Sequence, residues 1–274
     1  MPSPAQTRDE WSAAQYLKFR NQRTHAAFDL VGQLPLFSPA RVIDLGCGPG
    51  NSTEVLASRF PDADISGVDS SSDMLDRARR TLPRIRFVQA DVRTYDLAPG
   101  PGVDLLFSNA VFHWMRRGER VRTIIRLLKT QTAGNVFAFQ MPDYHEEPSH
   151  RAMREIAAAE GSWRKYFQGL DAEDRPELDP IESPAEYYNM LIPYCDRVDV
   201  WHTCYQHVMN GPRDIVEWVK GSGLQPFLNA LPEGVVRNDY LQAYEKRLEE
   251  VYSRLADGKI MLRYPRLFVV AVRK

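Results

Sequence analysis

Short apolar runs alternate with amphipathic stretches in the first half of the chain. The runs lie at residues 41–45, 65–68, 85–88, 103–107 and 135–141. Apolar residues with helical spacing follow three of them, at residues 51–60, 70–82 and 121–129. The second of these helices has a capping-box-like start at Ser70 and Asp73. Because buried parallel strands read as continuous apolar runs, the pattern predicts repeated βαβ units and a sheet covered by helices on both faces.

The pattern changes after residue 141. Residues 142–193 are polar and rich in proline, and helices are predicted there at 149–160 and 185–191. Further along, the pattern predicts a strand at 198–209, helices at 213–220 and 235–255, and a final strand at 261–272. We expect one α/β domain with an insertion between its fifth and sixth strands. Its parts are N-terminal cap helices at 1–39, a ligand-binding core at 40–141, a substrate-side insertion at 142–195, and the completion of the sheet at 196–274.

Composition narrows the class of protein. The 274 residues carry a formal net charge of -1, which does not favour a nucleic-acid partner. Cys47, Cys195 and Cys204 form no CxxC pair, and no His/Cys cluster has metal-ligand spacing, so we expect no metal and a reducing, cytoplasmic location. The apolar runs are too short for a membrane span. The sequence does not specify an oligomeric state.

Polar residues follow the first four runs at the edge of the sheet where ligands bind. A glycine loop with Gly46, Gly48 and Gly50 follows the first run, and glycine allows tight turns and a close approach of the backbone to a ligand. The next three runs are followed by Asp69, Asp91 and Asn109. Together these residues predict a ligand site along this edge.

The loop does not suit a dinucleotide. The pattern GxGxxG would need glycine where Asn51 stands, and Pro49 lacks an N–H that a phosphate could use. Asp44 adds a negative charge, which disfavours a pyrophosphate and favours a ligand with an ammonium group. Asp69 is placed to accept from ribose hydroxyls, and Asp91 from an adenine amino group. These features favour a nucleoside with a cationic tail.

Three segments resemble the first motifs of the class I (Rossmann-like) S-adenosylmethionine-dependent methyltransferases. They are Asp44-Leu45-Gly46-Cys47-Gly48-Pro49-Gly50, Gly67-Val68-Asp69, and Asp91. The resemblance implies S-adenosyl-L-methionine as the cofactor. The cofactor-binding residues it implies are Asp44, Gly46, Cys47, Gly48, Asn51, Asp69, Ser70, Met74, Asp91, Val92, Asn109 and Ala110. Residues 108–114 lack the Asn/Asp-Pro-Pro-aromatic motif of enzymes that methylate nucleobases or glutamine, which argues against such substrates.

Nearly the whole chain also resembles the trans-aconitate 2-methyltransferase family. Segments outside the cofactor motifs that carry this likeness include Gln140-Met141-Pro142-Asp143, Val198-Asp199-Val200-Trp201 and Pro265-Arg266-Leu267-Phe268-Val269-Val270-Ala271. The resemblance implies methyl transfer to one carboxylate of trans-aconitate, giving the monomethyl ester. Two positions depart from the family pattern: His25-Ala26 replaces an Arg-Pro pair, and His113 replaces a glutamine. Both departures fall in segments that we expect to line the substrate pocket.

Methyl transfer to a carboxylate requires no general base, because the carboxylate is already ionised at pH 7. We expect the substrate site to combine aromatic walls with donors for the remaining carboxylates, under cover of the insertion. The candidates are Tyr16, Arg23, His25, Phe112, His113, Trp114, Tyr187, Tyr188 and Arg266. Tyr16 and Arg23 are alternatively placed to contact the methionyl end of the cofactor. For His145, His150 and His207 we expect capping or core roles.

Three other functions fit parts of the sequence. The enzyme could methylate an oxygen or nitrogen of another small metabolite, such as a phenol or an amine. A nicotinamide-dependent dehydrogenase is disfavoured by Pro49 and Asn51. A non-catalytic cofactor-binding protein is disfavoured because the cofactor motifs are intact and the insertion is expected to form a substrate pocket beside them.

Overall fold

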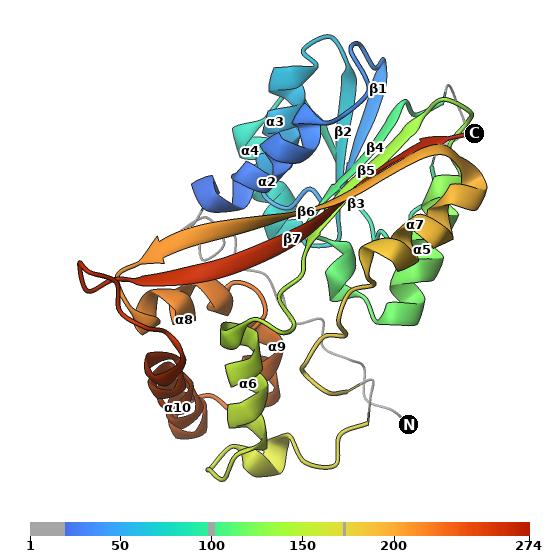
Figure 1. Cartoon of the computed structure of the whole chain (residues 1–274). Coiled ribbons are helices and arrows are strands. Elements are labelled where there is room, and N and C mark those ends of the chain that lie inside the picture. Colours follow the sequence, from blue (N-terminus) through green and yellow to red (C-terminus); the bar gives the residue numbers. More distant parts are fainter. Residues whose placement is uncertain (1–19, 98–101, 172–173) are drawn as a thin grey trace.

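The computed structural model describes residues 20–97, 102–171 and 174–274 and contains one seven-stranded sheet (Figure 1). Its strands are β1 (Arg41–Leu45), β2 (Asp64–Asp69), β3 (Arg86–Gln89), β4 (Leu105–Asn109), β5 (Val136–Pro142), β6 (Cys195–Met209) and β7 (Ile260–Arg273). The strand order is β3-β2-β1-β4-β5-β7-β6. Strands β1 to β5 are parallel, and β7 runs antiparallel between β5 and β6. The predicted Rossmann-like sheet is confirmed.

Helices cover both faces of this sheet, and further helices form a separate layer. They are α2 (Arg20–Gly32), α3 (Asn51–Arg59), α4 (Ser72–Thr81), α5 (Arg117–Lys129), α6 (Pro148–Ala158), α7 (Pro184–Leu191), α8 (Pro212–Lys220), α9 (Gln225–Ala230) and α10 (Val235–Val251). Alternate residues of β5 point to opposite faces: Phe137 and Phe139 pack toward α5 and α7, whereas Ala138 packs toward α2 and α3. Of the predicted cap helices, α2 is described, while residues 1–19 lie outside the described part of the chain.

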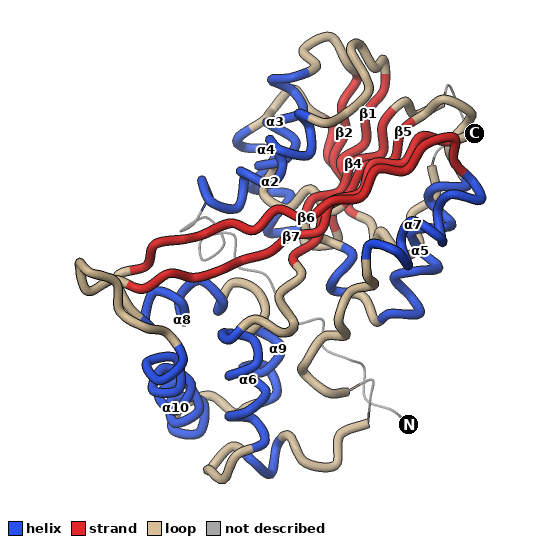
Figure 2. The backbone as a smooth tube through the Cα atoms, viewed as in Figure 1, coloured by secondary structure: helices blue, strands red, loops and turns tan. Residues whose placement is uncertain are grey.

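A second helical layer lies beneath the long antiparallel pair of β6 and β7, which extends well past the parallel strands (Figure 2). The insertion between β5 and β6 contributes α6, and the segment between β6 and β7 contributes α8, α9 and α10. Buried aromatic side chains, including Trp218, Tyr240, Tyr244 and Tyr264, fill the space between them. In the described parts of the chain, no helix has the length and apolarity needed to cross a membrane.

The prediction of Ser70 as the cap of α4 is wrong by one residue. The cap is Ser71, whose side-chain oxygen accepts a hydrogen bond from the Met74 N–H at 3.4 Å. Asp69 explains the shift, because its Oδ1 accepts from the Ser71 N–H at 2.9 Å and thereby fixes where the chain leaves β2. Ser70 is left exposed beside the end of the strand.

Asp44 links β1 to the first turn of α3. Its Oδ2 accepts hydrogen bonds from the hydroxyls of Ser52 at 2.7 Å and Thr53 at 2.6 Å, and the residue is fully buried. Burial raises the pKa of this carboxyl to about 6, although the two hydroxyls act in the opposite direction. Asp44 therefore connects the two ends of the glycine loop, because it joins the end of β1 to the start of α3.

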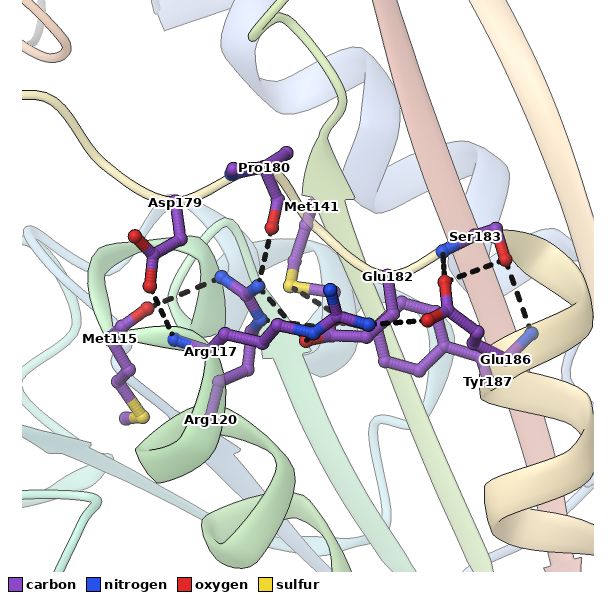
Figure 3. Close-up of polar contacts among 10 residues, drawn as sticks. All are labelled: Met115, Arg117, Arg120, Met141, Asp179, Pro180, Glu182, Ser183, Glu186 and Tyr187. Carbon is purple, nitrogen blue, oxygen red and sulfur yellow. Dashed lines mark hydrogen bonds and ion pairs between the residues drawn. The ribbon is translucent and has the colours of Figure 1, made fainter.

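A buried ion pair ties the insertion to α5 (Figure 3). Arg120 and Glu182 form two hydrogen bonds, from Nε at 2.9 Å and from Nη2 at 3.0 Å, and their side chains are 0% and 2% exposed. Arg120 also donates to the carbonyls of Met115 at 3.2 Å and Pro180 at 2.7 Å. Glu182 in turn accepts from the Tyr187 hydroxyl at 2.5 Å. The pair is fully hydrogen-bonded, which compensates for removing both charges from water.

We predict that Glu182→Gln strongly destabilises the fold. The substitution leaves Arg120 as a buried cation without its carboxylate, a change worth about 3–5 kcal/mol. Urea denaturation followed by circular dichroism measures the free energy of unfolding. Asp76→Asn, which breaks an exposed pair with Arg79, is the control and should have little effect. Similar small losses in both variants would contradict this account.

We predict that Asp44 makes the protein less stable as pH rises. The folded carboxyl ionises near 6 and the unfolded one near 4, so between these values the folded state holds a proton that the unfolded state has lost. The unfolding free energy should fall by about 2 kcal/mol from pH 4 to 7 through this group. Asp44→Asn cannot ionise, so its stability should lack this component of the pH dependence. Parallel pH profiles for the two proteins would show that Asp44 does not titrate in this way.

Candidate active site

A cleft of about 390 Å³ opens at the carboxyl ends of the parallel strands. This is the edge at which ligands bind in open α/β sheets. The predicted cofactor residues that line it are Gly46, Gly48, Asp69, Ser70, Met74, Asp91, Val92, Asn109 and Ala110. The structure therefore brings together nine of the twelve residues that the sequence motifs indicated.

The glycine loop is shaped by close packing at Gly46. Its φ is 68°, and a Cβ atom there would lie 2.2 Å from Cγ2 of Val111, so no side chain fits. The N–H groups of Gly46 and Cys47 donate to the carbonyl of Val68 at 2.7 and 2.9 Å. The loop is thus held against β2, with its backbone facing the cleft.

Asp69 joins the glycine loop to the start of α4. Its Oδ2 accepts from the Gly48 N–H at 2.8 Å, and its Oδ1 accepts from the Ser71 N–H at 2.9 Å. Burial raises the pKa of Asp69, while the backbone donors lower it. A carboxylate has about four acceptor sites, so this half-buried group can still accept from hydroxyls in the cleft.

Asp91 already has a cationic partner. Arg93 donates to it from the backbone N–H at 2.8 Å and from Nε at 2.8–2.9 Å, and these bonds lower the pKa of the Asp91 carboxyl. Arg93 also lies 3.7 Å from Glu119, and both residues line the cleft. This pair was not predicted from the sequence, although an arginine two residues after an aspartate at the end of a strand could have indicated it.

Three predicted cofactor residues do not line the cleft. Asp44 is turned inward to α3, and Asn51 is buried at the start of that helix. Cys47 packs its side chain against Leu75 and Phe87, and burial raises the pKa of its thiol well above the usual value. These three residues therefore support the glycine loop on the side that faces away from the cleft.

A chain of hydrogen bonds connects β7 to the rim of the cleft. Arg266 donates from Nη1 to Oε1 of Gln140 at 3.1 Å, and Nε2 of Gln140 donates to Oδ1 of Asn109 at 2.5 Å. The next residue, Ala110, has a φ of 62°, and its N–H donates to the Gln140 carbonyl at 3.0 Å. A buried cation thus fixes the amide that ends β4, and the chain turns there through a backbone conformation that alanine seldom adopts.

The short helix η1 (Phe112–Trp114) supplies the next part of the wall. Trp114 lines the cleft, and the His113 ring lies 4.8 Å from its ring, centroid to centroid, beside a smaller cavity. Burial lowers the pKa of His113 well below its usual value, and the charges of Arg266 and Arg120 lower it further, so the ring is neutral at pH 7. Phe112 instead packs in the core against Phe139.

The structure does not bring the other substrate candidates to the cleft. Arg23 donates to the Trp218 carbonyl at 2.9 Å, and His25 is exposed on α2. Tyr187 is fully buried and bonded to Glu182, and Tyr188 lies in a surface groove beside β6. Tyr16 falls outside the described residues. Of the eight candidates within the described residues, Trp114, His113 and Arg266 gather near the cleft.

The remaining histidines pack against aromatic rings or lie near the surface. His150 stacks on Tyr144, as expected for a core role, and His207 lies 4.7 Å from the Trp218 ring, between centroids. His145 is partly exposed beside Glu146. His150 and His145 line the small cavity next to His113.

Comparison with known proteins gives consistent matches. A family profile described as a methyltransferase domain matches residues 42–131. Two solved structures share the fold at low identity. One is the YcgJ protein of Bacillus subtilis, with a TM-score of 0.55 and 12% identity over 91% of this chain and 99% of that one. The other is a phosphoethanolamine N-methyltransferase 2 of Haemonchus contortus, with a TM-score of 0.52 and 15% identity over 91% and 53%.

Curated relatives match almost from end to end. A trans-aconitate 2-methyltransferase of Rhodopseudomonas palustris (strain HaA2) is 47% identical over 96% of this chain and 99% of the relative. Proteins of the same name from Paracidovorax citrulli and Agrobacterium fabrum are 46% and 45% identical over 96% of this chain, and over 98% and 99% of their own lengths. The chain therefore belongs to the trans-aconitate 2-methyltransferase family of class I S-adenosylmethionine-dependent methyltransferases.

Proposed function

We propose that this protein transfers a methyl group from S-adenosylmethionine to a carboxylate of trans-aconitate or a similar small polycarboxylic acid. The products are a monomethyl ester and S-adenosylhomocysteine. The observation that carries the proposal is the near-complete match to relatives named trans-aconitate 2-methyltransferase. The cleft supports it: the predicted cofactor residues line one part, the cofactor half, and Trp114 lines the other part, the acceptor half, which lies near the cation Arg266. Three free cysteines fit a cytoplasmic location.

The cofactor half of the cleft fits an S-adenosylmethionine molecule. Asp69 would accept from the ribose hydroxyls with lone pairs that its two backbone bonds leave unused. Met74 and Val92 offer apolar surfaces to the adenine ring, and Asp91 would accept from its amino group. Gly46 and Gly48 line the cleft, and their backbone would contact the methionyl end. When bound, the cofactor supplies an electrophilic sulfonium methyl group.

The residues of the other half would bind and orient the acid. Trp114 forms a wall that excludes water, so that the opposite charges of carboxylate and sulfonium attract each other through a medium of low polarity. The carboxylate requires no deprotonation, so no side chain has to remove a proton. Arg266 contributes a positive charge next to this half and fixes Asn109 through Gln140. Catalysis then depends on proximity and alignment.

A second candidate is methylation of a neutral hydroxyl or amine of another small metabolite. It is favoured by His113, because its neutral, buried ring has the protonation state that a general base needs. Because its lowered pKa already leaves that base neutral at pH 7, both reactions should have a flat rate profile above neutral pH. The two candidates differ instead in the product and in the need for His113, because methylation of a carboxylate requires no base.

Incubation of the protein with S-adenosylmethionine and a panel of di- and tricarboxylic acids tests the proposal. Mass spectrometry should detect an alkali-labile monomethyl ester, and kcat should stay flat from about pH 6 to 9. The control panel contains phenols, alcohols and amines of similar size. A methylated phenol, alcohol or amine as the product, formed with a kcat that His113→Asn lowers at least tenfold, would favour the second candidate.

We predict that Asp69→Ala weakens cofactor binding at least tenfold. Two hydrogen bonds to a charged acceptor are lost, each worth about 1.5–3 kcal/mol. Isothermal titration with S-adenosylhomocysteine measures the affinity, and circular dichroism checks the fold. Asp73→Ala, on the first turn of α4, is the matched control and should bind normally. An unchanged affinity of folded Asp69→Ala for S-adenosylhomocysteine would show that Asp69 does not bind the ribose hydroxyls.

A further inference from the structure

A small cavity of about 30 Å³ lies beside the cleft, between η1, the segment that follows β5, and α6. Its walls include His113, Tyr144, His150 and Gly223. Leu178 of the insertion lines both the cavity and the cleft, so the two spaces share a wall. The volume has room for about two water-sized oxygen atoms.

Three buried side chains each leave one polar atom without a hydrogen-bond partner among the described residues. These atoms are Nδ1 of His113, the hydroxyl of Tyr144 and Nε2 of His150. The three residues are only 4%, 7% and 5% exposed. Buried polar groups are nearly always hydrogen-bonded in folded proteins, so three unpartnered atoms around one cavity indicate that something polar binds there.

Packing holds the three rings in one arrangement. Tyr144 and His150 stack with their centroids 3.7 Å apart, and His113 meets Tyr144 edge-on at 5.7 Å. Nδ1 of His150 lies 3.1 Å from the Ser149 hydroxyl, which directs the Nε2 atom away from it. Gly223 lets the His150 ring pack directly against the backbone, because a Cβ there would lie 2.7 Å from Nε2 of His150.

The charged groups on the cavity wall already have partners. Asp143 lies 3.0 Å from His202, Glu177 lies 3.4 Å from Arg175, and Asp179 lies 2.5 Å from Arg175. Arg154, which also lines the cavity, donates to the carbonyls of His145 at 2.7 Å and His150 at 3.4 Å. Burial keeps the Tyr144 hydroxyl protonated by raising its pKa well above the usual value, so it can donate at any physiological pH.

We propose that this cavity is a subsite for one non-reacting carboxylate of the polycarboxylic acid. The Tyr144 hydroxyl and Nε2–H of His150 donate to its oxygens, and the Nδ1 edge of His113 completes the site. The proposal rests on the proposed function, since it assumes that another carboxylate of the same acid faces the methyl donor in the cleft. The shared wall at Leu178 and the adjoining rings of His113 and Trp114 place the two spaces side by side.

Such a subsite would select acids by their second carboxylate. A site built to hydrogen-bond one group rejects analogues without it, because the buried donors are then left unpaired. Neutral donors bind a carboxylate through hydrogen bonds of defined direction, so the position of that group along the acid would matter. The subsite would therefore help to decide which carboxylate reaches the methyl group.

Two variants test the subsite in the full-length protein. Tyr144→Phe removes one donor without changing the ring, and Gly223→Ala displaces the His150 ring because the new Cβ would lie 2.7 Å from its Nε2. Tyr240→Phe is the matched control, because it removes a buried hydroxyl bonded to the Met153 carbonyl in the same helical layer. Calorimetric titration of trans-aconitate into protein saturated with S-adenosylhomocysteine measures binding of the acid without turnover. Titration of S-adenosylhomocysteine alone verifies the cofactor site.

We expect both variants to bind trans-aconitate at least tenfold more weakly, and S-adenosylhomocysteine as tightly as the unmodified protein. Tyr240→Phe should leave both affinities unchanged. Equal trans-aconitate affinity in all four proteins would overturn the subsite and leave water as the cavity's occupant. If the unmodified protein binds the acid through Tyr144 but forms no ester, the proposed function fails and the subsite stands. If the unmodified protein does not bind the acid, both proposals fail.

Discussion

The buried pair of Arg120 and Glu182 is the interaction on which the geometry of the substrate side depends. It fixes the chain at residues 180–182 against α5, and the Arg120 guanidinium binds the Pro180 carbonyl in the same contact. Leu178 lies two residues earlier, so the pair sets the position of the side chain that separates the cleft from the small cavity. Arg117 extends this anchoring, because its backbone N–H donates to Asp179 at 2.8 Å (Figure 3).

The two halves of the cleft are built by different means. The cofactor half is formed by turns that directly follow β1 to β4, and short contacts such as Asp69 with Gly48 and Ser71 fix it. The acceptor half is assembled from segments far apart in the chain, as in the sequence of hydrogen bonds from Arg266 through Gln140 to Asn109. A fold of this kind can retain its cofactor site while the acceptor site varies.

Local sequence signals explain why the sheet and the cofactor half were predictable. The strand at Arg41–Leu45 was predicted to the residue, and Asp69 and Asp91 line the cleft because parallel strands end at the same edge. Boundaries that depend on side-chain contacts were less accurate. Ser71 caps α4 in place of Ser70 because Asp69 binds its N–H, and the prediction extended α10 four residues beyond its end at Val251.

The acceptor half was harder to predict because its members are defined by tertiary packing. Tyr187 was a reasonable candidate by sequence, but Glu182 holds its hydroxyl in the core. Conversely, His150 was expected to pack in the core, and it does, yet its Nε2 atom also faces a cavity that forms only where α6 meets η1. No periodicity or spacing in the sequence indicates Tyr144 as a binding residue, because its place at the cavity depends on how its ring packs against His113 and His150.

The most direct measurement is a crystal structure of the protein with S-adenosylhomocysteine and trans-aconitate. We expect the ribose hydroxyls on Asp69 and one carboxylate of the acid in the cleft beside Trp114, close to the cofactor sulfur. We expect a second carboxylate in the cavity, within hydrogen-bonding distance of the Tyr144 hydroxyl and His150 Nε2. An acid bound with both of these carboxylates outside the cavity and the cleft would contradict it.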